Sequence, residues 1–245
     1  MIVLRPKDLY YSVLDTLNGQ GNCFRVRRRY RQEYNTFRTH SSLDARTIAS
    51  MKPAVQSTDN SIRRNAIELS CQISLEKILS DKYGFELFAA HLVKELSLEN
   101  ILFLTEYMQL KHFIVVHQLQ KYVTDIGCLL PICPNLIQKN FHPRLLQTTL
   151  SAPTIWFICL NMFHYLYGHY VMSGSVALLN LSFETSSNIT RQMTELRRTS
   201  SVKSLQPLIT AFDIAASDII RLLRGDSFYR FQLSRECIRY CEELV

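Results

Sequence analysis

The chain has 245 residues, of which 47% are hydrophobic, and its formal net charge is +7. It contains only seven glycines and seven prolines, so its composition argues against a strand-rich protein and favours an all-α one. The length permits one large domain, or one domain with an extension. A positive charge of this size suits an acidic partner, an anionic membrane surface or nucleic acid, and does not choose among them.

The seven cysteines are an odd number. Cys128 and Cys133 are close in sequence, as are Cys237 and Cys241, but neither pair has histidines at the spacing of zinc ligands. We therefore expect reduced thiols in a cytoplasmic protein, with no metal and no cofactor. The opening residues MIVLRPKDLYY reach a charge at Arg5 before any apolar run develops, so we expect no signal peptide.

Residues 1–60 lack a sustained hydrophobic period and contain the basic run RVRRRYR. We predict a basic, partly ordered extension, joined to a domain that begins near Ser61. The simpler interpretation of the run is a solvated segment, and the alternative is contact with an anionic membrane surface. The arginines concerned are Arg25, Arg27, Arg28, Arg29 and Arg31.

Helical patterns begin after Ser61. The stretch SLEKILSDKYGFELFAAHLVKEL shows two apolar faces separated by Gly84, which predicts that this glycine ends one helix before the next begins. Ser97 precedes the apolar pattern LENILFLTEYMQLKHFIVVHQLQKY. We predict that Ser97 caps this helix, with Glu99 near its positive end.

The segment Leu145–Phe183 contains no Asp, Glu, Lys or Arg, and is long enough for a transmembrane helix. Its Pro, His, Gly and hydroxyl residues instead favour a buried core helix from Pro153 to about Met172, followed by a loop. A short helix is predicted near Ile189–Leu196. Another is predicted in PLITAFDIAASDIIRLLR, where apolar residues recur with the helical period.

The octapeptide RGDSFYRF follows that last helix. We predict that Gly225 takes the left-handed conformation that ends the helix, and that Asp226 or Ser227 caps the next one. Capping does not account for Arg230, which comes one helical turn after Asp226, so we predict that these two side chains pair. Taken alone, a structural pair and a functional one explain this spacing equally well.

Three blocks of the sequence, in this order, resemble an RGS domain, the regulator of G-protein signalling family. They are SLEKILSDKYGFELFAAHLVKELSLENILF at the family's opening, LNLSFETSSNITRQM at its loop and short helix, and FDIAASDIIRLLRGDSFYRF at its closing segment. The match covers residues 67–240 of a predicted domain at 61–245. It leaves an insertion, residues 112–152, between the helices matched to the fourth and fifth.

The resemblance implies an all-α fold of about nine helices in two lobes, of which one is an antiparallel four-helix bundle and the other gathers both ends of the domain. Such domains are not enzymes: they bind the switch regions of a Gα subunit, accelerate its GTP hydrolysis and so inhibit signal transduction. Nucleic acid is not expected as a partner, and peripheral attachment at the inner face of the plasma membrane stays open. The Gα-contacting positions of the family fall on Glu95, Ser97, Glu99, Asn100, Asn180, Leu222, Asp226, Ser227 and Arg230.

The resemblance assigns roles to several of these residues. Asn100 and Asn180 are expected to hydrogen-bond the switch backbone and the hydrolytic glutamine, whereas Glu95 and Glu99 form an acidic rim. Taken singly, each asparagine also fits an ordinary helix start or turn. Only their family register favours a contact role.

The chain departs from the family pattern at Leu96, Leu104 and Phe228, where members carry an aromatic residue, Trp and Tyr respectively. Leu96 lies beside the expected contact surface and bears on affinity or Gα preference. Two other functions stay open: an RGS-like scaffold that binds Gα or another partner without accelerating hydrolysis, and a membrane-associated part of a larger receptor-like protein. The motif RRTSS resembles a basophilic kinase site, with Ser200 as the predicted acceptor.

Overall fold

The computed structural model describes residues 60–119, 123, 125–127, 130–134, 137, 150–175, 177–199 and 205–244. The chain divides into two compact units between Arg63 and Arg64, and nearly all described residues belong to the second unit. Within these ranges the regular structure is helical and no strand occurs, which confirms the all-α prediction. The predicted membrane-contact arginines between Arg25 and Arg31, and the predicted phosphosite Ser200, lie outside the described residues.

The described residues form α-helices and two π-helical segments, which are labelled η. In chain order they are α3 (Asn60–Gln72), α4 (Leu75–Ser80), α5 (Lys82–Lys94), α6 (Leu98–Val116), α8 (Ala152–Leu166), η3 (Tyr167–Val171), α9 (Phe183–Thr199), α10 (Leu205–Leu222), η5 (Leu223–Ser227), α11 (Phe228–Gln232) and α12 (Arg235–Glu242). The short helix predicted near 189–196 is longer than expected, because α9 begins at Phe183. The first residues of the predicted insertion belong to α6.

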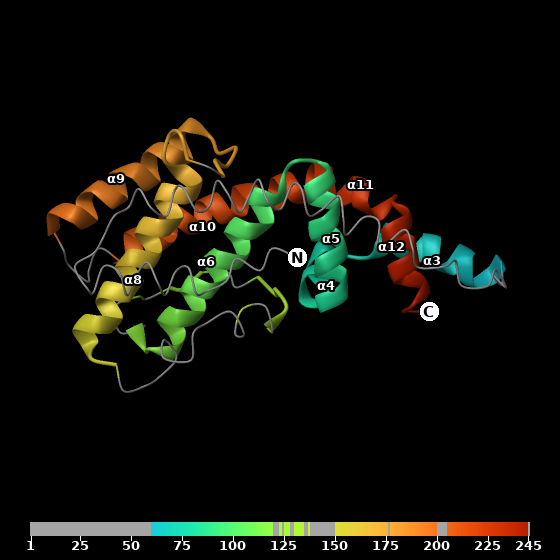
Figure 1. Ribbon diagram of the computed structural model, residues 1–245, viewed down its shortest axis with the longest axis horizontal. Helices are drawn as coiled ribbons and strands as arrows, with labels where there is room; N and C mark the ends of the chain where they lie inside the picture. Colours follow the sequence, from blue (N-terminus) through green and yellow to red (C-terminus); the bar gives the residue numbers. More distant parts are fainter. Residues whose placement is uncertain are drawn as a thin grey trace, which may run out of the picture. The chain divides into compact units, whose positions relative to one another are not determined.

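One group of helices joins the two ends of the second unit (Figure 1). There α5 packs against α4 from the same end and against α11 and α12 from the other. The ring of Phe88 on α5 meets those of Phe228 and Phe231 at centroid separations of 5.7 and 5.2 Å. Aromatic pairs at such separations add to the free energy of apolar burial, so one core holds both ends together.

The other group is a bundle of α6, α8, α9 and α10 (Figure 1). Helix α6 contacts both α8 and α10, and α10 also contacts α9. Buried residues occur all around α6, including Phe103, Tyr107 and Phe113. A helix that is apolar on every side is enclosed by its neighbours, so α6 is the central helix of the bundle.

The break between α4 and α5 falls at Asp81, and the prediction of a helix-ending glycine at Gly84 is wrong. The Asp81 carboxylate caps α5 by accepting a hydrogen bond from the Gly84 backbone N–H at 2.7 Å. A Cβ atom on Gly84 would lie 2.9 Å from the carbonyl oxygen of Ile78. The glycine therefore permits a close approach between α4 and α5, and is not needed for a left-handed turn.

Helix α8 begins close to the predicted position. The Ser151 hydroxyl accepts a hydrogen bond from the Thr154 backbone N–H, and Pro153 occupies the first turn. Ile158, Cys159 and Phe163 bury their side chains in the bundle, which confirms the predicted core helix. Among the described residues, no helix combines the length and the hydropathy that crossing a bilayer requires.

Candidate functional site

The segment RGDSFYRF continues the helix instead of breaking it. Residues Leu223–Ser227 form the π-helical turn η5, which runs directly from α10 into α11. Gly225 does not have a positive φ, and the Ser227 side chain makes no capping hydrogen bond. The predicted left-handed glycine and the predicted cap by Asp226 or Ser227 are therefore wrong. Single π-helical turns inside α-helices are frequent at functional sites.

The predicted pairing of Asp226 with Arg230 is confirmed, and Arg230 has a second partner. Its guanidinium donates through Nη1 to Asp226 Oδ1, and through Nε and Nη2 to the two carboxylate oxygens of Glu95 at 2.5 and 3.0 Å. A two-pronged arginine–carboxylate pair fixes geometry as well as charge. It joins α11 to the end of α5, 135 residues earlier in the chain.

Glu95 lies at the centre of this cluster. The Arg230 guanidinium lowers the pKa of Glu95, as do the Ser227 hydroxyl and His91, while partial burial opposes them. His91 Nε2 lies 3.1 Å from Glu95 Oε1. The carboxylates of Glu95 and Asp226 in turn raise the pKa of Arg230. The charge of Glu95 is thus matched within the protein, which weakens its predicted role in an acidic rim.

Glu99 completes the acidic residues predicted on this face. It lies in the first turn of α6, where a carboxylate favours the positive end of the helix. Partial burial raises its pKa. A basic group on a partner would reverse that shift, because it stabilises the ionised form.

The turn between α5 and α6 has a left-handed residue that the sequence did not reveal. Leu96 has a φ of 56°, and the residue is 78% exposed. The Leu96 N–H donates to the Val93 carbonyl at 3.2 Å and the Ser97 N–H to the Leu92 carbonyl at 3.0 Å. This pattern usually has glycine at the left-handed position. A branched side chain there costs about 1–2 kcal/mol.

The first turn of α6 contains two buried polar atoms, Ser97 Oγ and Asn100 Oδ1, that have no hydrogen-bond partner among the described residues. Ser97 occupies the predicted cap position, but its side chain makes no capping hydrogen bond, so that part of the prediction is wrong. The Asn100 side chain is buried, and its Nδ2 donates to the Ser97 carbonyl at 3.2 Å. An unsatisfied buried acceptor costs about 1–3 kcal/mol.

Asn180 lies on the loop between η3 and α9, with its side chain exposed. The residue before it anchors the loop, since the Leu179 N–H donates to the Tyr170 carbonyl at 2.9 Å. Two residues later, the Ser182 hydroxyl caps α9 by accepting the Thr185 N–H at 3.0 Å. Asn180 is therefore presented from a loop that is fixed on both sides.

A hydrogen bond connects the end of this loop to α10, the helix that continues into η5. Thr185 Oγ1 donates to Asp218 Oδ2 at 2.9 Å, which ties the start of α9 to the last turns of α10. Asp218 precedes Leu222, the predicted contact residue on α10, by one helical turn. Within the described part of the chain, no hydrogen bond or ion pair links Asn180 directly to Arg230 or its partners.

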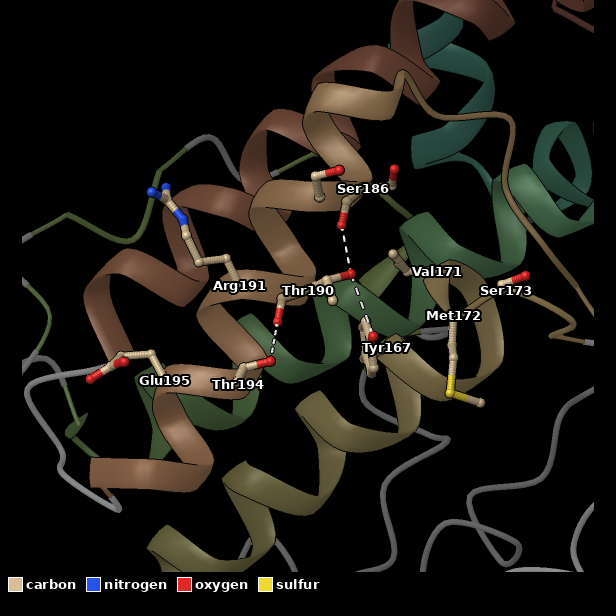
Figure 2. A pocket seen from close by; sticks show the side chains of 10 residues that line it. Tyr167, Val171, Met172, Ser173, Ser186, Thr190, Arg191, Thr194 and Glu195 are labelled. Carbon is tan, nitrogen blue, oxygen red and sulfur yellow. Dashed lines mark hydrogen bonds between the residues drawn. The ribbon is translucent and has the colours of Figure 1, made fainter.

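A groove of about 620 Å³ lies between η3 and α9 (Figure 2). Hydroxyl groups predominate along it, and Tyr167 Oη lies 3.4 Å from Thr190 Oγ1 across the groove. None of the predicted contact residues lines it. Its walls are Tyr167, Val171, Met172, Ser173, Ser186, Ser187, Thr190, Arg191, Thr194 and Glu195.

Two residues that support this face were missed in the sequence. Glu76 on α4 forms an ion pair with Arg224 of η5, 148 residues away, and no local pattern reveals such a distant partner. His91 lies one turn before Glu95 on the same helix, and that spacing was a usable signal.

Arg230 holds the carboxylates of Asp226 and Glu95 in place, and the exposed amide of Asn180 stands on an anchored loop; carboxylate and amide groups suit basic side chains and polypeptide backbone. Within the described ranges, no cluster of His, Cys, Asp and Glu could hold a metal ion. The chain matches no family model and no curated protein.

Proposed function

We propose that this chain is a regulator of G-protein signalling, which binds the switch regions of a Gα subunit and stabilises the transition state of GTP hydrolysis. The observation that carries the proposal is the Arg230 fork, because it joins two segments that the RGS resemblance assigns to one contact surface. The proposal extends to the fold. We assign the bundle and the lobe that joins both ends to the two lobes of an RGS domain, with residues 112–152 as an insertion.

The energy that this function requires is small. A Gα subunit supplies its own catalytic arginine and glutamine, and hydrolyses GTP at about 10⁻² per second without help. A partner accelerates the reaction by holding the switch loops in the conformation that suits the transition state. A hundredfold acceleration takes only about 2.7 kcal/mol of preferential stabilisation. A few well-placed hydrogen bonds are sufficient.

Two amides carry this stabilisation in the proposed mechanism. Asn100 is assigned to a donor on the switch backbone, which its unsatisfied Oδ1 accepts once the buried side chain turns towards the partner. Asn180 presents an exposed amide from an anchored loop, within reach of the hydrolytic glutamine. Neither residue takes part in the chemistry, so the chain is an activator and not an enzyme.

The ion cluster positions a second part of the contact surface. Leu222, Asp226 and Ser227 form the receiving surface for a switch-loop side chain, and Arg230 orients the Asp226 carboxylate through its Nη1. Glu95 acts through Arg230 instead of meeting a basic switch residue directly. Glu99 remains the acidic group available to such a residue.

Single-turnover GTP hydrolysis tests the proposal. The variant Asn180→Ala, which removes an exposed side chain, should lower the stimulation of Gα at least tenfold without changing the thermal unfolding midpoint. Asn100→Ala should act in the same direction. Asn188→Ala is the matched control, because this asparagine on α9 is engaged with Arg191 and should leave stimulation unchanged. Full stimulation by both site variants would refute the assigned roles.

Binding of Gα without acceleration of hydrolysis is the alternative function. It is favoured by the ion pair between Glu95 and Arg230, because a paired carboxylate is less available to a basic switch residue. A scaffold of this kind would bind Gα without preferring the transition state. The two functions separate in a pull-down of Gα in its GDP, GTP-analogue and GDP–aluminium fluoride forms. Preference for the aluminium fluoride form supports activation, and equal capture of the two triphosphate-like forms supports the scaffold.

A further inference from the structure

The start of α9 is attached to α10 through a polar side chain. The two helices pack against each other, and farther along α9 the buried residues are apolar, as at Ile189 and Met193. Within residues 183–188, by contrast, Thr185 is the only buried residue, at 6% exposed. Its hydroxyl donates to Asp218 Oδ2 at 2.9 Å. A buried hydroxyl needs a hydrogen-bond partner, so the placement of this first turn depends on Asp218.

Asp218 stands at the end of a chain of hydrogen bonds that leads back to the loop of Asn180. The Ser182 hydroxyl donates to Thr185 Oγ1 at 2.9 Å, while its oxygen accepts the Thr185 backbone N–H at 3.0 Å. Thr185 therefore connects the Asp218 carboxylate to Ser182, which comes two residues after Asn180. Hydrogen bonds to a carboxylate are stronger than those between neutral groups, and they polarise the bonds that precede them in a chain.

The Asp218 carboxylate is also held from its own helix. Arg221 Nη2 donates to Asp218 Oδ1 at 3.3 Å, so the two carboxylate oxygens have separate partners. The Asp218 side chain is only 26% exposed. Leu222 follows one helical turn later, where α10 continues into η5. Asp218 thus joins the Asn180 loop to the helix that leads into the second part of the contact surface.

We propose that Asp218 is a positioning residue: acting through Thr185, it sets where Asn180 stands with respect to η5. Neither Asp218 nor Thr185 is among the positions that the RGS resemblance assigns to Gα contact. The inference rests on the proposed function, since Asn180 is the residue that it positions. The loop has a separate attachment, from the Leu179 N–H to the Tyr170 carbonyl, so loss of the Asp218 contact should loosen the loop without unfolding the protein.

Amide hydrogen exchange of the free chain, measured by NMR, tests the contact without a partner. Asp218→Ala should speed exchange of the Thr185 N–H several-fold, because the Ser182 cap loosens when the Thr185 hydroxyl loses its acceptor. Asp218→Asn has a side-chain oxygen that can still accept from Thr185, so exchange should stay close to the wild-type rate. Ser217→Ala is the matched control, since the Ser217 hydroxyl donates within α10 to the Asp213 carbonyl.

Single-turnover GTP hydrolysis tests the positioning role itself. Asp218→Ala should lower the stimulation of Gα about fivefold, on the scale of one net hydrogen bond, and Asp218→Asn should retain most of the stimulation. In the Asn180→Ala background, Asp218→Ala should cause no further loss, because the side chain that it positions is already gone. A purely structural role would instead lower stimulation by the same factor in both backgrounds.

The outcomes separate this role from the proposed function. If Asn180→Ala lowers stimulation but Asp218→Ala does not, or if the two losses add in the double variant, the positioning role is refuted and the proposed function stands. Unchanged exchange of the Thr185 N–H in Asp218→Ala would also refute it. If the wild type stimulates no Gα subunit, the proposed function is refuted and the positioning role with it, and faster exchange would then show an anchor of the loop alone.

Discussion

Charged groups are arranged differently in two regions of the molecule. One is the middle of the bundle, and the other is the surface formed by the α5–α6 turn, η5 and α11, which we call the loop face. In the bundle, Lys111 is 0% exposed and pairs with Asp213, which also accepts a hydrogen bond from the Tyr107 hydroxyl at 2.8 Å. On the loop face, Arg230 is 48% exposed and pairs with carboxylates of two other segments. Water screens the Arg230 guanidinium and not the Lys111 ammonium, so the two cations have different consequences for stability.

The bundle pair is closed off by a segment of the predicted insertion. Gly127 has a φ of +68°, and a Cβ atom on it would lie 2.1 Å from Asp213 Oδ2. The same segment is fastened to α10, because Asp125 and Gln206 exchange hydrogen bonds of 3.2 and 2.9 Å. The interior charges are therefore part of the fold's support, whereas those on the loop face remain accessible to a partner.

The comparison is tested most strongly at Lys111. Replacing it by methionine keeps much of the apolar volume but leaves the Asp213 carboxylate without its cation. Because Asp213 is 25% exposed, breaking the pair should cost about 3 kcal/mol of unfolding free energy, the lower end of the range for buried pairs, as measured by urea denaturation. Lys94→Met is the control, since Lys94 forms an exposed pair with Glu236 and should cost less than about 1 kcal/mol. Equal effects of the two variants would remove the distinction between the regions.

A second acidic group of the bundle, Glu106 on α6, has tyrosines as its partners. Burial raises the pKa of Glu106 to about 8, although the Tyr170 and Tyr165 hydroxyls, at 2.8 and 3.4 Å, oppose the shift. Between about pH 4.5 and 8 the unfolded chain loses this proton while the folded chain keeps it, so stability falls as pH rises and levels off above that window. The neutral acid is the form that the bundle accepts.

Glu106→Gln should therefore stabilise the protein, because glutamine has the shape of the neutral acid and cannot ionise. The gain should be small at pH 5 and reach about 4–5 kcal/mol at pH 9, measured as the shift in urea unfolding, because each unit of pKa shift corresponds to about 1.4 kcal/mol. Glu236→Gln on the surface should have the opposite sign, because Lys94 lowers the pKa of Glu236. A Glu106→Gln advantage that does not vary with pH would show that the carboxyl reaches water.

The contrast also explains how far the sequence could predict the structure. Helices with a clear apolar period, such as α10, were placed correctly, and the Asp226–Arg230 spacing revealed a real pair. Glycines were misread. Gly84 and Gly225 both lie inside helical turns, because a glycine also serves close packing or a wider turn, which no local pattern distinguishes from a helix end.

The rest depended on contacts between distant segments. Nothing near Glu95 in sequence indicates that Arg230 will neutralise it, and nothing near Lys111 indicates that Asp213 will be its partner. The left-handed Leu96 was equally hidden, since leucine is the wrong residue type for that conformation. These ion pairs and this left-handed residue depend on tertiary packing, and a local sequence pattern does not reveal them.

The smallest effect on stability is expected at Arg230, where we also expect the largest difference between the effect on stability and the effect on function. Arg230→Ala should lower the free energy of unfolding by less than about 1 kcal/mol, because the Arg230 guanidinium is half exposed and water screens it. The Glu95 pKa should rise towards its usual value in this variant, because Arg230 is the main cause of its lowering. The stability that an ionised Glu95 provides, which is lost as pH falls through its depressed pKa, should shrink in the variant.

The same substitution should reduce stimulation of GTP hydrolysis at least tenfold, because Asp226 loses the group that orients it. Arg230→Lys discriminates between charge and geometry: lysine keeps the charge but not the fork, so it should retain stability and still lose stimulation. If Arg230→Ala instead destabilised the protein as much as Lys111→Met, the surface cluster would be a support of the fold like the buried one. A loss of GTPase stimulation with little loss of unfolding free energy would show that the Arg230 cluster serves partner binding, whereas the Lys111–Asp213 pair serves the stability of the bundle.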